Sequence, residues 1–367
     1  MNGILYRDEL KGYDFGIGHP FRGDRYRLFR QLISELMPED NTYRTIAAEP
    51  ATDADLSLIC DKDYIQFTRD FFDGGSMSHN VMERFARFHS ADNFTNARPG
   101  TLERAARVVV GQAKRACDLV QNGEYKKVIS VGGGLHHAKR SYGEGFCLYN
   151  DVAFCGLYLQ EHYRLEKILI LDTDAHAGNG TAEYFYESPN VLLVDIHQDS
   201  HTIYPGTGFI EQTGKGKGTG FTINVPMPPG AGDNAYKLVF EEIVQPVFEE
   251  FKPDIIVRNG GSDPHYQDQL TGLGLSLKGF NMIGSKVREM SADCGDKCID
   301  LIASGYNIDV LPYAWLSLIT GLFGIDMHLD ERGEESEIPD PGSEYEKTIE
   351  VIKEIRKTFK RFWHCFV

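Results

Sequence analysis

The chain has 367 residues, of which 41% are hydrophobic and 11% aromatic, and its formal net charge is -16 at pH 7. This composition indicates a globular protein with a large buried core, in one large α/β domain or two smaller ones. The negative charge repels phosphate backbones, so it argues against direct nucleic-acid binding and favours a cationic substrate.

Membrane attachment and disulfide bonds are not expected. The first residues, "MNGILYRDELKGYDFGIGHP", lack the apolar core of a signal peptide, and the chain has no run of about 18 apolar residues. Seven cysteines, an odd number without paired spacing, are typical of a reducing compartment. Cys294 and Cys298, in "CGDKC", lack the second ligand pair of a structural zinc site. The sequence therefore predicts a cytoplasmic protein without a membrane span.

Short apolar segments and amphipathic segments alternate along the chain. Helical patterns cover residues 100–123, 150–166 and 235–251, and strand patterns cover residues 126–131, 166–174, 190–196, 253–261 and 297–305. The strand segments are apolar on both faces, as in a sheet buried between helix layers. We therefore predict an α/β fold with a mainly parallel sheet and helices on both faces.

Domain boundaries are absent from the sequence pattern, since no repeat, low-complexity tract or linker divides the chain. The strongly polar stretch at residues 330–344, "DERGEESEIPDPGSE", indicates a solvated acidic loop before a C-terminal helix over residues 345–362. The sequence thus predicts a single domain that spans residues 1–367.

Polar residues follow the predicted strands at their carboxyl ends, where parallel α/β sheets place their chemistry. In chain order these residues are His136, His137, Asp172, Asp174, His176, Asp195, His197, Asp263 and Tyr306. The adjacent histidines in "GGGLHH" follow three glycines, which indicates that another group approaches both imidazoles closely. We therefore expect these side chains to meet at one edge of the sheet.

The segment "DTDAHAGNG" has the pattern of a metal site. Asp172, Asp174 and His176 alternate, so in an extended segment all three point to the same side. Two carboxylates and one neutral imidazole balance a divalent cation and leave a coordination position open, as in catalytic sites. Asp263, in "GGSDPH", is the third expected ligand. The alternatives are a helix N-cap for Asp174 and a buried core histidine for His176.

Several motifs occur in a fixed order, namely "GGLHHAKRSYGEGFCLYND", "DTDAHAGNGT", "YPGTG", "GGSD" and "SGYN". Together they resemble the zinc-dependent histone deacetylase family, and "GYDFGIGHPFRGDRYRLF" is similar to its acetoin-utilization deacetylase branch. The resemblance extends from about Tyr13 to about Gly324. It implies an arginase-like fold, with one parallel sheet of about eight strands between helices, and hydrolysis of an acetylated amine, typically N-ε-acetyl-lysine.

The resemblance also implies two cation sites. Asp174, His176 and Asp263 match the ligands of one Zn2+ per chain, a site in which Fe2+ or Co2+ also substitutes. A structural monovalent cation, typically K+, is implied as well. The matching residues, several through their carbonyl groups, are Asp172, Asp174, His176, Asp195 and Ile196.

Catalytic roles follow from the same resemblance, because amide hydrolysis needs an activated water, an oxyanion donor and an acid for the departing amine. His137 matches the general base and acid, with His136 as an electrostatic partner that Asp172 orients. Asn179 stands where some members have aspartate, so the partner of His137 is neutral. Tyr306 matches the oxyanion donor, although without the flanking motifs it would be taken for a core tyrosine.

An acyl-lysine tunnel is the third feature that the resemblance implies. Phe146, after Gly145, and Tyr204, before "PGTG", match its aromatic walls. Phenylalanine is commoner at the second wall, so Tyr204 either adds a polar group or simply packs. Leu270 matches a lower rim position. Asp92 matches an aspartate that holds the substrate backbone, although "ADNFTNARPGT" departs from the usual pattern.

Two further positions concern the surroundings of the site. Arg25 resembles the arginine near the internal channel that releases acetate, with an ordinary buried ion pair as the alternative. Ala177 replaces the second histidine that the family usually carries after the ligand aspartate. This change alters the surroundings of the metal without removing a ligand.

Two other functions compete with the deacylase. A two-metal ureohydrolase of the arginase type also has "DAH", but it needs a carboxylate where this chain has Gly178. A non-catalytic module that binds acyl-lysine would lose the histidine pair, a metal ligand or Tyr306, and all are present. Acetylated histone tails, metabolic enzymes and polyamines all fit as substrates, and the oligomeric state stays open.

Overall fold

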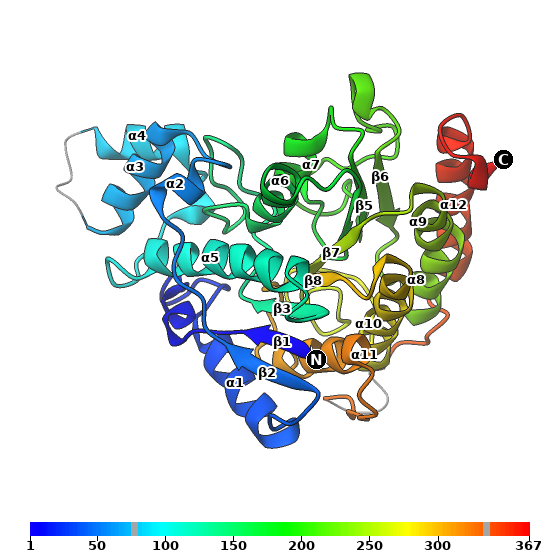
Figure 1. The fold of residues 1–367 in the computed structure, drawn as a ribbon, viewed down its shortest axis with the longest axis horizontal. Helices are drawn as coiled ribbons and strands as arrows, with labels where there is room; N and C mark the ends of the chain where they lie inside the picture. The colour runs from blue at the N-terminus through cyan, green and yellow to red at the C-terminus, as the bar shows by residue number, and fades with distance from the viewer. Residues whose placement is uncertain (75–79, 333–337) are drawn as a thin grey trace.

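A parallel sheet of eight strands runs through the middle of the molecule (Figure 1). The computed structural model describes residues 1–74, 80–332 and 338–367. In spatial order the strands are β2 (Tyr43–Ile46), β1 (Asn2–Leu5), β3 (Lys127–Val131), β8 (Cys298–Ile302), β7 (Ile255–Gly260), β4 (Ile168–Asp172), β5 (Val191–Gln198) and β6 (Thr222–Met227). All neighbouring strands are parallel, which confirms the predicted sheet.

Burial explains why the central strands have continuous apolar sequences. Every residue of β3, β4, β5, β7 and β8 is buried, so no face of these strands alternates with polar residues. The predicted strand segments coincide with these strands. The pattern does not predict β1, β2 or β6, because β1 and β2 are only four residues long and β6 contains Pro226.

Helices cover both faces of the sheet (Figure 1). One face carries α5 (Leu102–Gln121), α6 (Asp151–Tyr163) and α7 (Asn179–Phe185). The other carries α1 (Asp24–Leu36), α8 (Asp233–Val239), α9 (Gln245–Phe251), α10 (Leu277–Ser291), α11 (Leu311–Phe323) and α12 (Tyr345–Phe359). The helices α2 (Asp53–Leu56), α3 (Lys62–Phe72) and α4 (Val81–Phe88) lie beside one end of α5, away from the sheet.

All four predicted helices differ in range from the observed ones, and α5 and α6 are shorter than the predicted segments 100–123 and 150–166. The segment 235–251 is not one regular helix, because α8 and α9 are joined by a wider π-helical turn at Phe240–Val244. Pro246 stands in the first turn of α9 and has no N–H to donate to the preceding turn, which explains why the regular α-helical pattern is interrupted here. Helix α12 ends at Phe359, before the predicted end at residue 362. Residues 333–337 of the predicted acidic loop lie outside the described residues.

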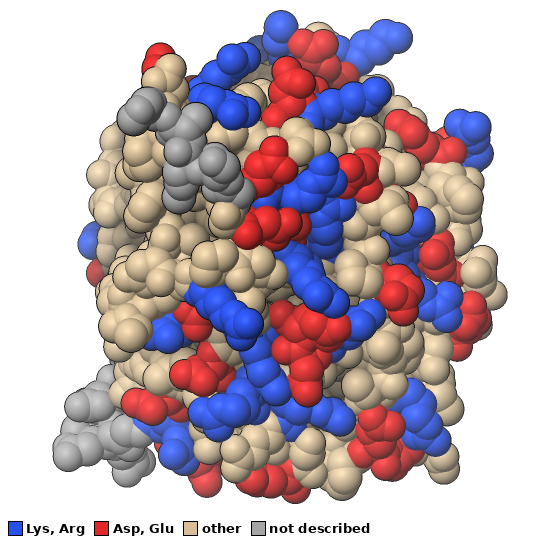
Figure 2. All heavy atoms as spheres, turned by 90° about the vertical axis from the view of Figure 1, so that its left-hand side faces the viewer, with Lys and Arg blue, Asp and Glu red and all other residues tan. Residues whose placement is uncertain are grey.

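Charges of both signs are mixed on the surface near α2 and α3. Figure 2 shows basic and acidic side chains next to each other on this face. Arg69 and Arg107 both pair with Asp53, and Lys114 pairs with Asp55. The described residues of this face therefore present no surface of a single sign to a phosphate backbone. Within residues 1–74, 80–332 and 338–367, no helix has the length and apolarity needed to cross a bilayer.

Candidate active site at the carboxyl edge of the sheet

The carboxyl ends of the central strands meet at one edge, because all strands run in the same direction. Asp172 ends β4 and lies opposite Asp195 of β5 in the register of the sheet. The strand ends and the loops at this edge carry the residues that the sequence analysis singled out. Those that are buried are His136, His137, Asp172, Asp174, His176, Asp195, Ile196, His197 and Asp263.

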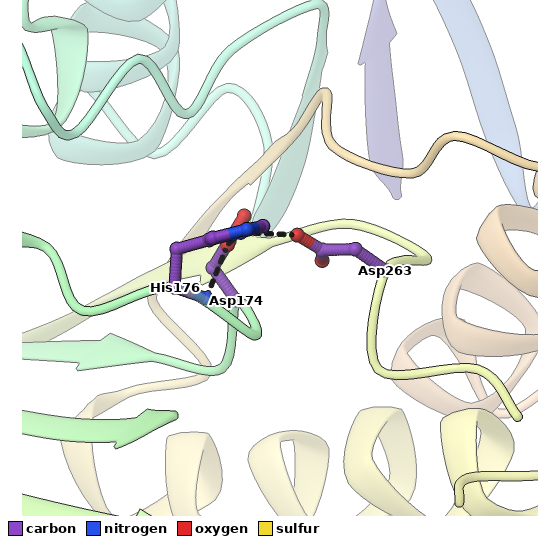
Figure 3. A group of neighbouring side chains, drawn as sticks. All are labelled: Asp174, His176 and Asp263. Carbon is purple, nitrogen blue, oxygen red and sulfur yellow. Dashed lines mark hydrogen bonds and ion pairs between the residues drawn. The ribbon is translucent and has the colours of Figure 1, made fainter. Parts of the chain in front are cut away.

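Asp174, His176 and Asp263 form a group that can hold a metal ion (Figure 3). Their ligand atoms all lie within 4.8 Å of one another. His176 Nδ1 is 3.2 Å from Asp174 Oδ1 and 3.1 Å from Asp263 Oδ2. Asp174 and His176 follow β4, whereas Asp263 follows β7, the neighbour of β4. Adjacent strands thus bring together ligands that are far apart in the sequence.

Asp172 does not belong to this group, contrary to the expectation from its alternation with Asp174. Strand β4 ends at Asp172, so the residues that follow are not extended. Asp172 Oδ1 accepts the N–H of Asp174 at 3.1 Å, and its Oδ2 lies 2.8 Å from His136 Nδ1. The alternation rule applies only within a strand, and a turn here directs Asp172 away from the metal-binding group.

The charged groups of this site shift one another's pKa values. Burial opposes protonation of His176, but hydrogen bonds that its ring donates to the carboxylates of Asp174 and Asp263 raise its pKa to about 10. Burial and the charge of Asp174 raise the pKa of Asp263. A proton on His176 therefore lies between two carboxylates, in the position that suits a divalent cation, and metal binding would displace that proton.

His136 contacts Asp172 on one side and His137 on the other. Asp172 Oδ2 also accepts a hydrogen bond from Asn259 Nδ2 at 2.9 Å, and the Nε2 atoms of the two histidines are 3.0 Å apart. Burial opposes a charge on His136, but the negative charges of Asp172 and Asp174 raise its pKa to about 9. The carboxylate of Asp172 therefore holds a proton on His136 Nδ1, and the raised pKa favours the charged form of this ring.

His137 is the neutral member of the pair. Burial, followed by the positive charges of His136 and His176, lowers its pKa well below the ordinary value. Its Nδ1 lies 2.7 Å from Asn179 Oδ1. Because an amide oxygen only accepts hydrogen bonds, Nδ1 carries the proton and Nε2 keeps its lone pair. His137 therefore offers a base at Nε2.

Asp151 holds the histidine loop and was missed by the sequence analysis. It begins α6, and its carboxylate accepts the N–H of Gly134 at 2.9 Å and that of Leu135 at 2.8 Å. Burial raises its pKa to about 7. The neighbouring Asn150 donates to the His136 carbonyl at 3.1 Å. Asn150 is the N-cap of α6, a role that its position at a helix start indicates, whereas no sequence pattern indicates that Asp151 holds the histidine loop.

Tyr306 follows β8 and packs beside the metal-binding group. Its ring centroid lies 6.4 Å from that of His176 and 5.9 Å from that of Phe146. Its backbone N–H donates to Asp268 Oδ2 at 2.7 Å. Burial, followed by the charge of Asp263, raises the pKa of Tyr306 well above 10. The hydroxyl therefore stays protonated and able to donate a hydrogen bond.

Two of the residues assigned to the tunnel pack against different residues of this site. Phe146 contacts Tyr306, whereas Tyr204 packs edge-on against His137 with ring centroids 5.1 Å apart. Tyr204 and Leu270 are each 41% exposed, which places them at the rim rather than in the core. The contact with His137 shows that the Tyr204 ring takes part in packing.

Asp92 is engaged within the protein. Its Oδ2 accepts the N–H of Gly145 at 3.0 Å, and its Oδ1 accepts a short hydrogen bond from the Ser90 hydroxyl. Its carbonyl oxygen lies 3.2 Å from His19 Nε2. Asp92 therefore supports the loop that carries Phe146.

Arg25 lies beneath Tyr306 in a buried position. Its Nη1 donates to the Ala303 carbonyl at 2.8 Å, and its guanidinium carbon lies 3.7 Å from the Phe21 ring centroid. No carboxylate of the described ranges is within ion-pair distance, so the alternative of an ordinary buried ion pair is wrong. Arg22, Arg25 and Tyr306 are among the residues that line a cavity of about 420 Å³.

Strand β5 and the loop after it lie next to the segment that carries Asp174 and His176. Asp195 Oδ2 accepts the N–H of Gly178 at 2.8 Å, and its Oδ1 lies 2.8 Å from His197 Nδ1. Gly208 lies so near Ala177 that a Cβ atom on Gly208 would overlap the alanine side chain. Ala177 and Gly208 are also among the residues that line a cavity of about 640 Å³, so the loop around Gly208 fills only part of the space next to Ala177.

Comparisons with known proteins agree with this geometry. The histone deacetylase domain family matches residues 19–322. The acetoin utilization protein AcuC of Staphylococcus xylosus is 35% identical over 325 residues, which cover 88% of this chain and 82% of AcuC. A probable deacetylase of Archaeoglobus fulgidus is 32% identical over 377 aligned positions, which cover 100% of this chain and 99% of that protein.

The fold is also shared with a solved structure. The crystal structure of the HDA15 HD domain superimposes with a TM-score of 0.83, covering 100% of this chain and 96% of that domain at 23% sequence identity. This similarity confirms the arginase-like fold that the motifs imply. The family match covers most of the chain, including the segments that carry the metal-binding group and the histidine pair. The chain therefore belongs to the histone deacetylase family and is a hydrolytic deacetylase.

Proposed function

We propose that this site removes acetyl, or other short acyl, groups from N-ε-acyl-lysine in proteins or from related acetylated amines. The observation that supports this proposal most directly is the placement of a metal-binding group beside two histidines whose pKa values are shifted in opposite directions. Amide hydrolysis needs a Lewis acid, a base for water and a proton for the leaving amine. The described residues supply a candidate for each need.

Asp174, His176 and Asp263 would hold one Zn2+ per chain, with Fe2+ or Co2+ as substitutes. When bound, the ion polarises the substrate carbonyl and lowers the pKa of the attacking water. A two-metal ureohydrolase fits less well, because Gly178 supplies no carboxylate for a second ion. Among the residues that the structure describes, no other group of three such ligands is close enough to hold a metal.

A structural monovalent cation, typically K+, is the second proposed ion. Its residues would be Asp172, Asp174, His176, Asp195 and Ile196. The carboxylates of Asp172 and Asp195 are buried on neighbouring strands, where uncompensated negative charge is costly. A nearby cation would compensate that charge.

Proton transfer would depend on His137. Its Nε2 takes a proton from the attacking water and later gives it to the departing amine. His136, oriented by Asp172, adds positive charge that favours the developing oxyanion, and Asn179 holds the Nδ1 proton of His137. Tyr306 donates its hydroxyl to the same oxyanion.

The acyl-lysine stem would pass between Phe146 and Tyr204, with Gly145 and Leu270 at the rim. Apolar ring faces suit a methylene chain. Asp92 would bind the substrate backbone while it supports Gly145. The cavity next to Arg25 would accept acetate, because a buried guanidinium without a carboxylate partner attracts an anion.

The whole chain, residues 1–367, would act as one deacetylase domain. Strands β1 and β2 come from the N-terminal part of the chain and join the same sheet as β3 and β8. Helix α12, from the C-terminal part, packs on β6 of that sheet. Both ends of the described chain therefore belong to the unit that carries the site.

The deciding test is a deacetylation screen of zinc-loaded protein with a mixed acetyl-peptide library and acetylated polyamines. We expect turnover of at least one class and about one tightly bound zinc-class ion per chain by elemental analysis. Asp263→Ala should lose both metal and turnover, since it removes a ligand. Asp199→Ala, which changes an aspartate outside the group, is the control and should keep both. Two tightly bound divalent ions required for activity would contradict the proposal.

A further inference from the structure

We propose that Glu144 is a positioning residue that fixes the tautomer of His137 through Asn179. The inference rests on the proposed function, because it concerns the base of that reaction. Glu144 lies on the loop between the histidine pair and Phe146, and its side chain is only 16% exposed. Its contact with the site is indirect, through the amide of Asn179.

The contacts form a continuous chain. Asn179 Nδ2 donates to Glu144 Oε1 at 2.8 Å, and Asn179 Oδ1 lies 2.7 Å from His137 Nδ1. His137 Nε2 lies 3.0 Å from His136 Nε2, and His136 Nδ1 lies 2.8 Å from Asp172 Oδ2. A carboxylate therefore stands at each end of the chain, with Asp172 at one end and Glu144 at the other.

Glu144 determines which way the amide of Asn179 faces. An ionised carboxylate only accepts hydrogen bonds, so it requires the NH2 group of Asn179 on its side. The amide oxygen must then face His137, and an oxygen there requires the proton on Nδ1. This leaves the lone pair of His137 on Nε2, where a general base needs it.

An asparagine without such a neighbour would not have this effect. If the amide rotated by half a turn, its NH2 group would face His137 Nδ1 and favour a proton on Nε2, which removes the base. An aspartate at position 179 would need no orienting partner, because both of its oxygens accept. Glu144 thus selects one of the two orientations that the Asn179 amide could adopt.

The backbone around Glu144 is fixed close to the histidine. Gly145 has a φ of +59°, and a Cβ atom there would overlap the His137 ring. The Gly145 N–H is held by Asp92, and the Cys147 N–H donates to the Glu144 carbonyl at 2.9 Å. These contacts hold the backbone of Glu144 in place next to His137.

Lys139 offers the competing explanation for this glutamate. Lys139 Nζ lies 3.0 Å from Glu144 Oε1 and 3.8 Å from Glu183 Oε2. If Glu144 served only to pair with Lys139, then Glu183 would be equivalent to it. Glu183 lies on α7 one turn after Asn179 and pairs with the same lysine, but in the part of the chain that the structure describes no hydrogen bond joins its carboxylate to the Asn179 amide, so it provides a matched control.

The experiment compares Glu144→Leu, Glu183→Leu and the double variant Glu144→Leu/Asn179→Asp, all zinc-loaded. We expect Glu144→Leu to lower kcat about tenfold or more, because a fraction of His137 then carries its proton on Nε2 and cannot act as the base. KM should change little, because the tunnel is intact. Glu183→Leu should keep kcat within about twofold. The double variant should recover most of the lost kcat, since the aspartate needs no orienting partner.

A second measurement does not depend on activity. Long-range 1H–15N spectra of 15N-histidine-labelled protein report which ring nitrogen carries the proton, and His137→Ala identifies the signal. Wild-type protein should show the Nδ1–H form, and Glu144→Leu a mixture of the two forms. An unchanged His137 spectrum with unchanged kcat in Glu144→Leu would overturn the inference, as would equal effects of Glu144→Leu and Glu183→Leu. Inactive wild-type protein with the Nδ1–H spectrum would instead contradict the proposed function.

Discussion

Replacement of Tyr306 tests whether a single residue affects turnover without affecting substrate binding. Its ring lies between Phe146 and His176, and burial keeps its hydroxyl protonated. Tyr306→Phe removes one hydrogen-bond donor and leaves the ring packing in place. If the hydroxyl donates to the oxyanion, kcat should fall about a hundredfold or more, which corresponds to about 3 kcal/mol.

The measurement is kcat, substrate affinity and zinc content of Tyr306→Phe. Affinity and zinc content should change little, because the ligands and the tunnel are retained. Tyr125→Phe, which changes a half-buried tyrosine next to β3, is the control and should match the wild type. Near-normal kcat in zinc-loaded Tyr306→Phe would return this residue to a packing role.

The contact between helices α10 and α11 depends on glycine residues, which have no side chain to separate the two backbones. A Cβ atom on Gly284 would overlap the Leu318 carbonyl, and one on Gly321 would overlap the Asn281 carbonyl. The two helix backbones are therefore in direct contact. Alanine normally stabilises a helix by about 1 kcal/mol relative to glycine, but here overpacking should outweigh that gain.

We expect Gly284→Ala and Gly321→Ala each to lower the free energy of unfolding by roughly 1–3 kcal/mol. Urea unfolding at pH 7 measures this quantity. Lys278→Ala, at an exposed position of α10, is the control and should stay within about 0.5 kcal/mol of wild type. A stabilising Gly284→Ala would show that the helices do not touch as described.

Strands β7 and β8 are joined by a buried ion pair. Arg258 and Asp300 are opposite each other in the sheet, and Arg258 Nε donates to Asp300 Oδ1 at 2.6 Å. Arg258 also donates to Thr173, in the segment that carries the metal-binding residues. Both charges are buried, so removal of one partner leaves the other uncompensated.

Asp300→Leu should therefore lower the free energy of unfolding by about 3–5 kcal/mol in urea titrations. The double variant Arg258→Met/Asp300→Leu should recover much of that loss, because no buried charge then remains. An equal loss in the single and double variants would show that packing, and not the charge pair, determines the effect.

At the scale of the whole molecule, the decrease in the free energy of unfolding at acidic pH should depend on His89. It follows α4, lies among aromatic rings and contacts Thr68 Oγ1 at 2.9 Å. Burial lowers its pKa from 6.5 to about 3. Between these values the unfolded chain binds one more proton than the folded protein, so stability falls as the pH decreases.

This single group should reduce the free energy of unfolding by about 2 kcal/mol between pH 7 and pH 5. His89→Gln removes the titrating group, so its loss between the two pH values should be smaller by that amount. His328→Gln, which changes a histidine that is 70% exposed, is the control and should retain the wild-type pH dependence. Equal pH dependence in all three proteins would show that His89 does not titrate as described.

The sequence by itself determined the fold class and the three residues of the metal-binding group. Strands that are buried on both faces need continuous apolar sequences, so β3, β4, β5, β7 and β8 could be found from their runs of apolar residues. Parallel strands place their carboxyl ends at one edge, which located His136, Asp174 and Asp263 in a common site. Hydrophobic patterns and motif order are local properties, and a linear sequence displays them directly.

Only the tertiary structure decided how these residues contact one another. Asp263 reaches His176 because β7 lies next to β4, a strand order that no local pattern encodes. Asp172 turns towards His136 because β4 ends at that residue. The partners of Asp151 and Glu144 were also hidden, since a hydrogen bond depends on the distance between two atoms, which the position of residues along the chain does not specify.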